Sequence, residues 1–205
     1  ILENVILDAD GIPNFHDSTL TQNTRASYPI ESIENRTDDS TAGHPDNIVF
    51  LTCDAFGVLP PIARLSPAQA AYHFISGYTA KVAGTEIGIT EPMATFSTCF
   101  GAPFMPRHPS EYADLLIKKI AEHNASCWLI NTGWIAGGYG ESSRIRIKWT
   151  RALLNAALSG ALDDVVYVTD ERFGFKIPAT CDGVPSEILQ PRSTWPNTER
   201  YDNVA

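Results

Sequence analysis

Two short apolar runs constrain the fold of this chain more than any other feature. Residues 47–53 read NIVFLTC and residues 126–130 read SCWLI. The first run has the β-branched, uninterrupted apolar pattern of a strand buried on both faces, and the second predicts another apolar strand. Asp54 follows the first run and the polar residues 131–133 follow the second. Ligands bind outside the carboxyl ends of strands in open α/β sheets, so we expect a site at these two loops.

Three helices are predicted between and after the two strands. Ser66 and Gln69 have the spacing of a capping box at the start of the first helix. The second helix is expected near 109–124 and the third near 148–159, where Gly160 is a natural stop. Strands that alternate with helices favour an α/β sheet with helices packed against it.

Composition excludes several classes of protein. The 205 residues carry a formal net charge of -9, and 43% of them are hydrophobic, as in soluble globular proteins. An acidic surface repels phosphate groups, so we expect neither nucleic acid nor membrane as a partner. No apolar run reaches the roughly 18 residues of a membrane span, and ILENV is not the start of a signal peptide. Because the chain starts without Met inside an apolar pattern, we expect it to be truncated.

The cysteines indicate a reducing compartment. Cys53, Cys99, Cys127 and Cys181 are far apart, and no pair has the C-x-x-C spacing of a zinc or redox site. Cys53 and Cys127 lie in the apolar runs, where a free cysteine acts as a small buried hydrophobe. We therefore predict a reduced protein of the cytoplasm.

Two loops permit more than one interpretation. Asp54 is placed either to orient a ligand or metal at the end of a strand, or to cap the turn that Gly57 imposes. The glycine-rich residues 137–140 lie between a strand and a helix, as a phosphate-binding loop does. The Lys-Ser/Thr pair that completes such a loop is absent after them, so a flexible connection or lid is the preferred interpretation.

Two basic segments are candidates for anion binding. Residues 144–151 form a dense basic cluster before a predicted helix, which suits a nucleotide phosphate. The alternative, slightly favoured by the pattern alone, is a solvated edge strand. Arg25 lies in a polar loop, where an arginine can hold a carboxylate or phosphate, although a solvated arginine is the favoured interpretation on spacing alone.

Several longer strings resemble one known family over nearly the whole chain. They are NTRASYPI (23–30), FLTCDAFGVLPPIARLSPAQAAYHFISGYTAKVAGTE (50–86), EPMATFSTCFGAPF (91–104), LINTGW (129–134), RIRIKWTRA (144–152) and GVPSEILQP (183–191). They closely resemble the carboxyl-terminal half of ATP-dependent phosphoenolpyruvate carboxykinases. The resemblance implies an α/β fold with a mixed sheet and flanking helices, of which residues 1–205 form an incomplete nucleotide-binding carboxyl-terminal domain, cut at both ends.

The resemblance also implies a reaction and its site residues. Enzymes of this family convert oxaloacetate and ATP to phosphoenolpyruvate, ADP and carbon dioxide in gluconeogenesis, with Mg²⁺ on the nucleotide and Mn²⁺ at the substrate. Arg25 matches the catalytic arginine that contacts both substrate and ATP, and Arg144, Ile145 and Thr150 match the adenine-nucleotide contacts. Residues 141–143 (ESS) depart from the small-basic pair that commonly precedes this Arg-Ile, which affects the expected geometry of the loop.

The same resemblance places other parts of the active site outside this chain. The phosphate loop, the Asp-rich kinase motif and the metal ligands are expected upstream of the equivalent of Ile1, in the same parent chain or in a companion chain. We therefore expect the isolated chain to be inactive. The alternative is a non-catalytic nucleotide-binding or interaction module, but the retention of Arg25 together with Arg144, Ile145 and Thr150 favours the enzyme.

Overall fold

The computed structural model describes residues 1–21, 23–83 and 88–205. Its contacts divide the chain into two compact units: residues 1–44 with 81–93, and residues 45–80 with 94–205. The second unit encloses a continuous apolar core, whereas none of the described residues of the first unit is buried.

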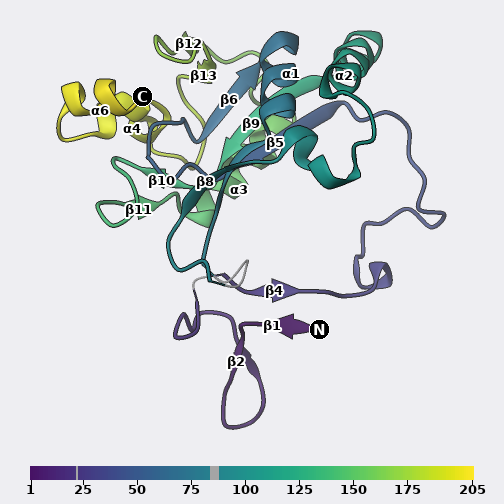
Figure 1. The fold of residues 1–205 in the computed structure, drawn as a ribbon, viewed down its shortest axis with the longest axis vertical. Helices are drawn as coiled ribbons and strands as arrows, with labels where there is room; N and C mark the ends of the chain where they lie inside the picture. The colour runs from purple at the N-terminus through teal and green to yellow at the C-terminus, as the bar shows by residue number, and fades with distance from the viewer. Residues whose placement is uncertain (22, 84–87) are drawn as a thin grey trace. The chain divides into compact units, whose positions relative to one another are not determined.

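A five-stranded mixed sheet forms the centre of the second unit (Figure 1). Its strands are β5 (Asn47–Thr52), β6 (Ile62–Leu65), β9 (Ser126–Asn131), β12 (Tyr167–Thr169) and β13 (Lys176–Pro178). The order across the sheet is β12-β13-β6-β9-β5. β5 and β9 are parallel and the other neighbours are antiparallel, so the prediction of a mixed α/β sheet is confirmed.

The two predicted strands differ in burial. Residues 127–131 of β9 are all buried, because β9 has a strand on each side and helices near both faces. β5 is an edge strand in the described sheet, and Leu51 exposes 59% of its surface. The prediction that residues 47–53 form a strand buried on both faces is therefore wrong, because an apolar run does not reveal how many neighbours a strand has.

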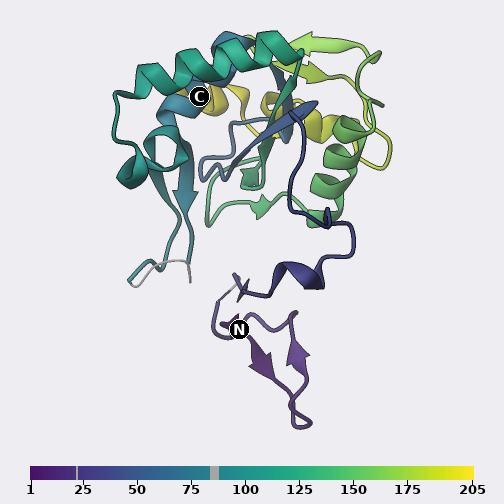
Figure 2. The ribbon, with the colours of Figure 1, turned by 90° about the vertical axis from the view of Figure 1, so that its right-hand side faces the viewer.

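Helices cover both faces of the sheet. They are α1 (Pro67–Ser76), α2 (Pro109–His123) and α3 (Ile147–Leu158). α1 begins with the predicted capping box, in which Ser66 and Gln69 each accept from the backbone N–H of the other. Figure 2 shows α2 and α3 on opposite sides of the sheet strands.

α1 ends where another segment approaches closely. Gly77 has φ of 53° and donates its N–H to the carbonyl of His73. A Cβ added at Gly77 would lie 1.8 Å from the carbonyl oxygen of Ser97, so only glycine fits at this position.

Shorter elements complete the second unit and join it to the first. They are β7 (Tyr78–Lys81), β8 (Met93–Phe96), two 3₁₀ turns at Thr98–Phe100 and Ala102–Phe104, β10 (Trp134–Ile135), β11 (Ser143–Arg144), α4 (Ser186–Leu189), α5 (Pro191–Thr194) and α6 (Thr198–Val204). β7 pairs with β8, and β10 pairs with β11. The core beneath these elements contains fully buried Trp128, Leu153 and Tyr201.

The first unit consists of short ribbons and turns. Its elements are β1 (Leu2–Glu3), β2 (Ile6–Leu7), β3 (Pro13–Asn14), β4 (Arg25–Ala26) and a 3₁₀ turn at Ile30–Ser32. β1 pairs with β4, and β2 pairs with β3. The chain turns after β2, where the Asp8 carboxylate accepts from the N–H groups of Asp10 and Ile12.

Candidate functional site

A buried carboxylate organises the loop that follows β5. Asp54 is fully buried and accepts hydrogen bonds from the N–H groups of Phe56 at 2.9 Å, Val58 at 2.7 Å and Leu59 at 2.8 Å. The hydroxyl of Tyr78 donates to the same carboxylate at 3.3 Å. Burial, together with the Asp54 charge, raises the pKa of Tyr78 above its ordinary range. These bonds favour the turn-capping interpretation of Asp54 over that of a metal or ligand contact.

A buried amide joins this loop to the one that follows β9. The Asn131 side-chain oxygen accepts from the N–H groups of Asp54 at 3.0 Å and Gly133 at 2.8 Å, and its amide donates to the carbonyl of Leu59 at 3.1 Å. A Cβ added at Gly133 would lie 2.2 Å from the carbonyl oxygen of Asp54. The two loops at the carboxyl ends of β5 and β9 are therefore held together, with no room for a larger residue between them.

The two joined loops after β5 and β9 form a frame. The β10–β11 hairpin extends from this frame and positions Arg144. The Arg144 guanidinium lies 5.4 Å from the ring centroid of Trp134, its partner across the hairpin. Its Nε donates to the carbonyl of Thr132 at 3.1 Å, and the N–H of Ile145 donates to the carbonyl of Gly133 at 2.8 Å. The contact with the indole ring and the hydrogen bond to Thr132 hold the guanidinium of Arg144 in one orientation.

The glycine-rich residues 137–140 form the tip of this hairpin and are attached at several points. The N–H of Tyr139 donates to the carbonyl of Ala55 at 3.0 Å, and the Ser142 hydroxyl donates to two carbonyls of the tip. A Cβ added at Gly57 would lie 2.1 Å from the carbonyl oxygen of Gly137. Backbone packs directly against backbone here, which the glycines permit, and the function of the tip as a flexible connection or lid remains a prediction.

A cavity of about 370 Å³ opens between this hairpin, the start of α3 and the segment from α4 to α5. It is lined by Ile135, Ala136, Glu141, Ser142, Ser143, Arg144, Arg146, Trp149, Ile188 and Thr194. The Arg146 guanidinium lies 5.0 Å from the ring centroid of Trp149. The lining therefore combines apolar and aromatic side chains with a few charged groups, as small-molecule sites do.

The charge around this cavity is opposite to that of the chain as a whole. Arg144 and Arg146 line it, while the carboxylate of Glu141 pairs with the Arg200 guanidinium at 2.6 Å. α3 starts beside the cavity, and no side chain caps its N-terminus at Arg146. Two arginines and the positive end of a helix dipole favour an anion here, although the chain carries a net charge of -9.

The structure places Ile145 and Thr150 beside the cavity rather than in its wall. Ile145 is 4% exposed and belongs to the core. Thr150 is half-buried in the first turn of α3, where its N–H donates to the carbonyl of Arg146 at 3.2 Å. Neither residue is among the described residues that line the cavity. Their predicted contact with a nucleotide remains a prediction.

Arg25 belongs to the first unit. It lies on β4 opposite Glu3 of β1, and its Nη1 is 3.3 Å from the Glu3 carboxylate. The side chains of Arg25 and Glu3 are 59% and 54% exposed. A small cavity of about 90 Å³ lies beside this pair. The catalytic role predicted for Arg25 is not visible in this pairing and remains a prediction.

Sequence reasoning missed the aromatic partners of the two arginines that line the cavity. Trp134 contacts Arg144 and Trp149 contacts Arg146, but neither tryptophan is among the site residues predicted from the sequence. Trp149 follows Arg146 closely in the sequence and could have been noticed there, whereas Trp134 meets Arg144 only through the pairing of the hairpin strands. Asn131 was recognised only as part of a polar loop, because its partners Asp54 and Leu59 are distant in the sequence.

The described residues place no cysteine in the wall of the arginine-lined cavity and provide no cluster of metal ligands. All four cysteines are free and buried, and burial raises the pKa of Cys127 to about 11. Within residues 1–21, 23–83 and 88–205, no group of three or more His, Cys, Asp or Glu side chains could hold a metal ion. None of the helices in the described part of the chain has the length and apolar character to cross a membrane.

Comparison with known proteins gives one consistent family. A family model described as phosphoenolpyruvate carboxykinase matches residues 1–187. The chain is 62% identical over all 205 residues to a protein of Mesorhizobium japonicum named phosphoenolpyruvate carboxykinase (ATP). Proteins with the same name from Rhizobium rhizogenes and Agrobacterium fabrum are 59% and 60% identical over the same length. In each case the chain spans 38% of the length of its relative.

Proposed function

Because the chain belongs to the family of ATP-dependent phosphoenolpyruvate carboxykinases, we propose that it is part of an enzyme that converts oxaloacetate and ATP to phosphoenolpyruvate, ADP and carbon dioxide. Residues 1–205 supply a portion of the carboxyl-terminal, nucleotide-binding domain of a longer parent polypeptide, since the chain spans 38% of the length of its relatives. The reaction serves gluconeogenesis, and the free, buried cysteines agree with a cytoplasmic location.

The cavity beside α3 supports a nucleotide-binding role. A purine ring has two flat faces that stack on aromatic rings or guanidinium planes, and the cavity offers Trp149 and the arginines 144 and 146. The same arginines and the start of α3 attract the phosphate groups. In this proposal Arg144 contacts the nucleotide, while Ile145 and Thr150 complete the adenine side of the site.

Arg25 has the second role in this proposal. Charge spreads over the phosphoryl oxygens as the phosphoryl group transfers, and a positioned arginine stabilises that charge without losing its proton. Arg25 therefore binds both the substrate and ATP in the parent enzyme. The exposed ion pair with Glu3 leaves its guanidinium accessible to such ligands.

The metals of the reaction, Mg²⁺ and Mn²⁺, are expected to bind elsewhere in the parent enzyme. Because the described residues provide no cluster of metal ligands, they do not fit a divalent ion. The metal ligands and the phosphate loop come from the amino-terminal half, in the same polypeptide or as a companion chain. The isolated chain should therefore form no phosphoenolpyruvate from oxaloacetate and ATP.

The nucleotide-binding part of the proposal is tested by titrating the 205-residue chain with ATP and following its backbone amides by NMR. Shifts should concentrate at Gly133, Arg144 and Thr150. Replacing Arg144→Gln removes the charge and the planar donor group, and should weaken binding about tenfold or more, which is about 1.4 kcal/mol.

Arg107→Gln is the matched control. Arg107 is an exposed arginine of the same unit, paired with Glu111 near the start of α2, so its loss should leave ATP binding unchanged. Equal affinity of the Arg144→Gln and wild-type chains would place the nucleotide elsewhere. Normal ATP binding by a parent protein that shows no turnover would instead favour the non-catalytic module.

A further inference from the structure

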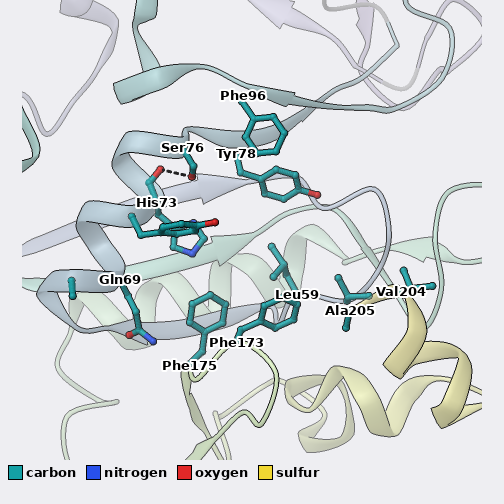
Figure 3. A pocket seen from close by; sticks show the side chains of 13 residues that line it. Leu59, Gln69, His73, Ser76, Tyr78, Phe96, Phe173, Phe175, Val204 and Ala205 are labelled. Atoms are coloured by element: carbon teal, nitrogen blue, oxygen red, sulfur yellow. Dashed lines mark hydrogen bonds between the residues drawn. The ribbon is translucent and has the colours of Figure 1, made fainter. Parts of the chain in front are cut away.

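Two cavities of the second unit differ in the charge of their walls. The larger one, of about 560 Å³, runs along α1, and none of its described lining residues has an Asp, Glu, Lys or Arg side chain (Figure 3). The arginine-lined cavity beside α3 has Glu141, Arg144 and Arg146 among its described lining residues. Of the two, the arginine-lined cavity is therefore the one that can attract or repel a charged ligand through its own wall.

Glu141 has the wrong sign of charge for an anion in this cavity. Among the described lining residues it is the one with a negatively charged side chain. Like charges repel, and a nucleoside triphosphate carries several negative charges that each add to the repulsion. The carboxylate lies close to the hairpin tip, since a Cβ added at Gly137 would be 3.7 Å from its Oε2. Left unpaired, this carboxylate would oppose the attraction of the two arginines.

Arg200 of α6 neutralises this carboxylate. Its Nη2 donates to Oε1 of Glu141 at 2.6 Å, although the two residues are 59 positions apart in the sequence. Arg200 is not among the described residues that line the cavity, so it acts on the wall through Glu141. The side chains of Arg200 and Glu141 are 58% and 49% exposed, and such exposed pairs contribute little to stability. The pair therefore matters more for the charge of the cavity than for the fold.

Arg200 is itself linked to the frame that carries the hairpin. Its guanidinium lies 5.8 Å from the ring centroid of Trp195. Trp195 is buried, and its indole N–H donates to the carbonyl of Gly57 in the loop after β5 at 2.9 Å. The backbone N–H of Arg200 donates to the side-chain oxygen of Asn197, which caps the start of α6. These contacts keep the guanidinium of Arg200 beside Glu141.

We propose that Arg200 is a positioning residue for nucleotide binding: by pairing with Glu141, it neutralises the carboxylate in the wall of the arginine-lined cavity and so permits a nucleoside triphosphate to bind. This role rests on the proposed function, because it takes the cavity as the nucleotide site. The benefit of Arg200 should grow with the negative charge of the ligand. Added salt should reduce that benefit, because salt screens exposed charges.

Substitutions in the intact parent protein test this role through the dissociation constants for ATP and adenosine, measured by isothermal titration calorimetry. Arg200→Gln leaves the Glu141 carboxylate unpaired and should weaken ATP binding about three- to tenfold at low ionic strength. Adenosine, which carries no phosphate, should bind equally well with and without the substitution. At about 1 M salt, where the screening length falls to about 3 Å, most of the loss for ATP should disappear.

Rescue distinguishes lost neutralisation from a damaged fold. Adding Glu141→Gln to Arg200→Gln removes the unpaired carboxylate and should restore the ATP affinity of the wild-type protein. Arg200→Lys keeps the positive charge and should retain most of that affinity. Arg107→Gln is the matched control: it removes an exposed arginine that pairs with Glu111, outside the described lining of the cavity, and should not change the affinity.

The role of Arg200 is rejected if Arg200→Gln binds ATP as tightly as the wild-type protein, or if Arg107→Gln loses as much affinity. It is also rejected if the loss persists in the double variant, or if adenosine binding falls as much as ATP binding. A loss of ATP affinity for Arg144→Gln without one for Arg200→Gln would reject this role and leave the proposed function standing. Unchanged ATP affinity for Arg144→Gln would place the nucleotide elsewhere and reject both.

Discussion

Leu153 and Leu189 of the second unit are fully buried, whereas Leu7 and Leu20 of the first unit expose 57% and 61% of their surfaces. Burying a leucine side chain stabilises a fold by about 1.5–3 kcal/mol, so the second unit gains from its apolar residues and the first does not. The first unit is held by short ribbons and by turns such as that at Asp8. The second unit can thus determine its own structure, while the first has little apolar contact to do so.

The two candidate arginines reflect this difference. Arg144 is held by the ring of Trp134 and the carbonyl of Thr132, both of which belong to a packed frame. Among the described residues, Arg25 has an ion pair with Glu3 in which both side chains are more than half exposed. Such exposed pairs contribute about 0–1 kcal/mol. Of the two candidate arginines, Arg144 is therefore fixed in its own unit and Arg25 is weakly held in its own.

The largest expected effect compares a buried leucine of the second unit with an exposed leucine of the first. Leu153→Ala removes a fully buried side chain from α3 and should lower the free energy of unfolding by about 2–5 kcal/mol. Leu7→Ala makes the same chemical change at an exposed position of β2 and should change it by less than about 0.5 kcal/mol. Urea unfolding of the two variants measures both values. Equal losses would show that the first unit is also stabilised by burial.

The next effect concerns the two arginines in a catalytically competent parent enzyme. Arg25→Gln should lower kcat by about 10²–10³, as does loss of a group that stabilises transition-state charge. Arg144→Gln should mainly raise the KM for ATP. The contact of Arg144 with ATP stabilises the ground state and the transition state equally, so its loss weakens ATP binding without changing kcat. Steady-state rates at varied ATP concentrations distinguish the two. A near-normal kcat for Arg25→Gln would remove Arg25 from the mechanism.

Two glycines with the same backbone conformation provide a smaller, closely matched comparison. Gly57 and Gly11 both have φ of 77°. A Cβ at Gly57 would lie 2.1 Å from the carbonyl oxygen of Gly137, whereas a Cβ at Gly11 would meet nothing within 4 Å. Substitution by alanine should cost about 1–2 kcal/mol at either position for the left-handed backbone. Gly57→Ala should cost about 1–3 kcal/mol more for the clash.

Urea unfolding of Gly57→Ala and Gly11→Ala provides the measurement. The Gly57→Ala variant should also weaken ATP binding, because the backbone of the hairpin tip must move. If the two variants lose the same stability, the close approach of Gly57 to the hairpin contributes nothing.

The sequence predicts those parts of the fold that depend on local signals. The capping box at Ser66 and the helix stop near Gly160 are determined by residues a few positions apart, and the structure confirms them. The burial of β5 depends on how many strands lie beside it, which no local pattern records. The Asp54–Asn131 hydrogen bond joins residues 77 positions apart, so it is not readable from spacing.

The candidate site is predictable only in part, for the same reason. The basic cluster that contains Arg144 is visible in the sequence, but the stacking of Arg144 on Trp134 requires the hairpin to form. Arg25 stands out through family resemblance alone, because its surroundings in the first unit are an exposed ion pair. Residues whose role depends on distant partners are therefore found by structure or by family pattern.

The smallest expected effect is on the pH dependence of stability, and it compares one ion pair from each unit. Asp202 of α6 accepts two hydrogen bonds from Arg192, at 2.9 and 2.8 Å, and also pairs with Arg172. The hydrogen bonds from Arg192 hold the pKa of Asp202 at about 2. In the unfolded chain an aspartate has a pKa of about 3.9, so the folded state favours the charged form. Asp202 therefore stabilises the fold above about pH 4 and loses that contribution as the pH falls toward about 2.

Comparing Asp202→Asn with the wild-type chain at pH 7, 5, 4 and 3 tests this sign. The variant should be slightly less stable at pH 7 and 5, and the difference should shrink at pH 4 and again at pH 3, measured by urea unfolding. Glu3→Gln is the counterpart in the first unit; its single contact with Arg25 at 3.3 Å is exposed, so no loss should be detected at any of these pH values. A difference for Asp202→Asn that stays constant down to pH 3 would mean that its carboxylate is not held by Arg192. A pH-dependent loss for Glu3→Gln would mean that the first unit holds its arginine more firmly than its exposure indicates.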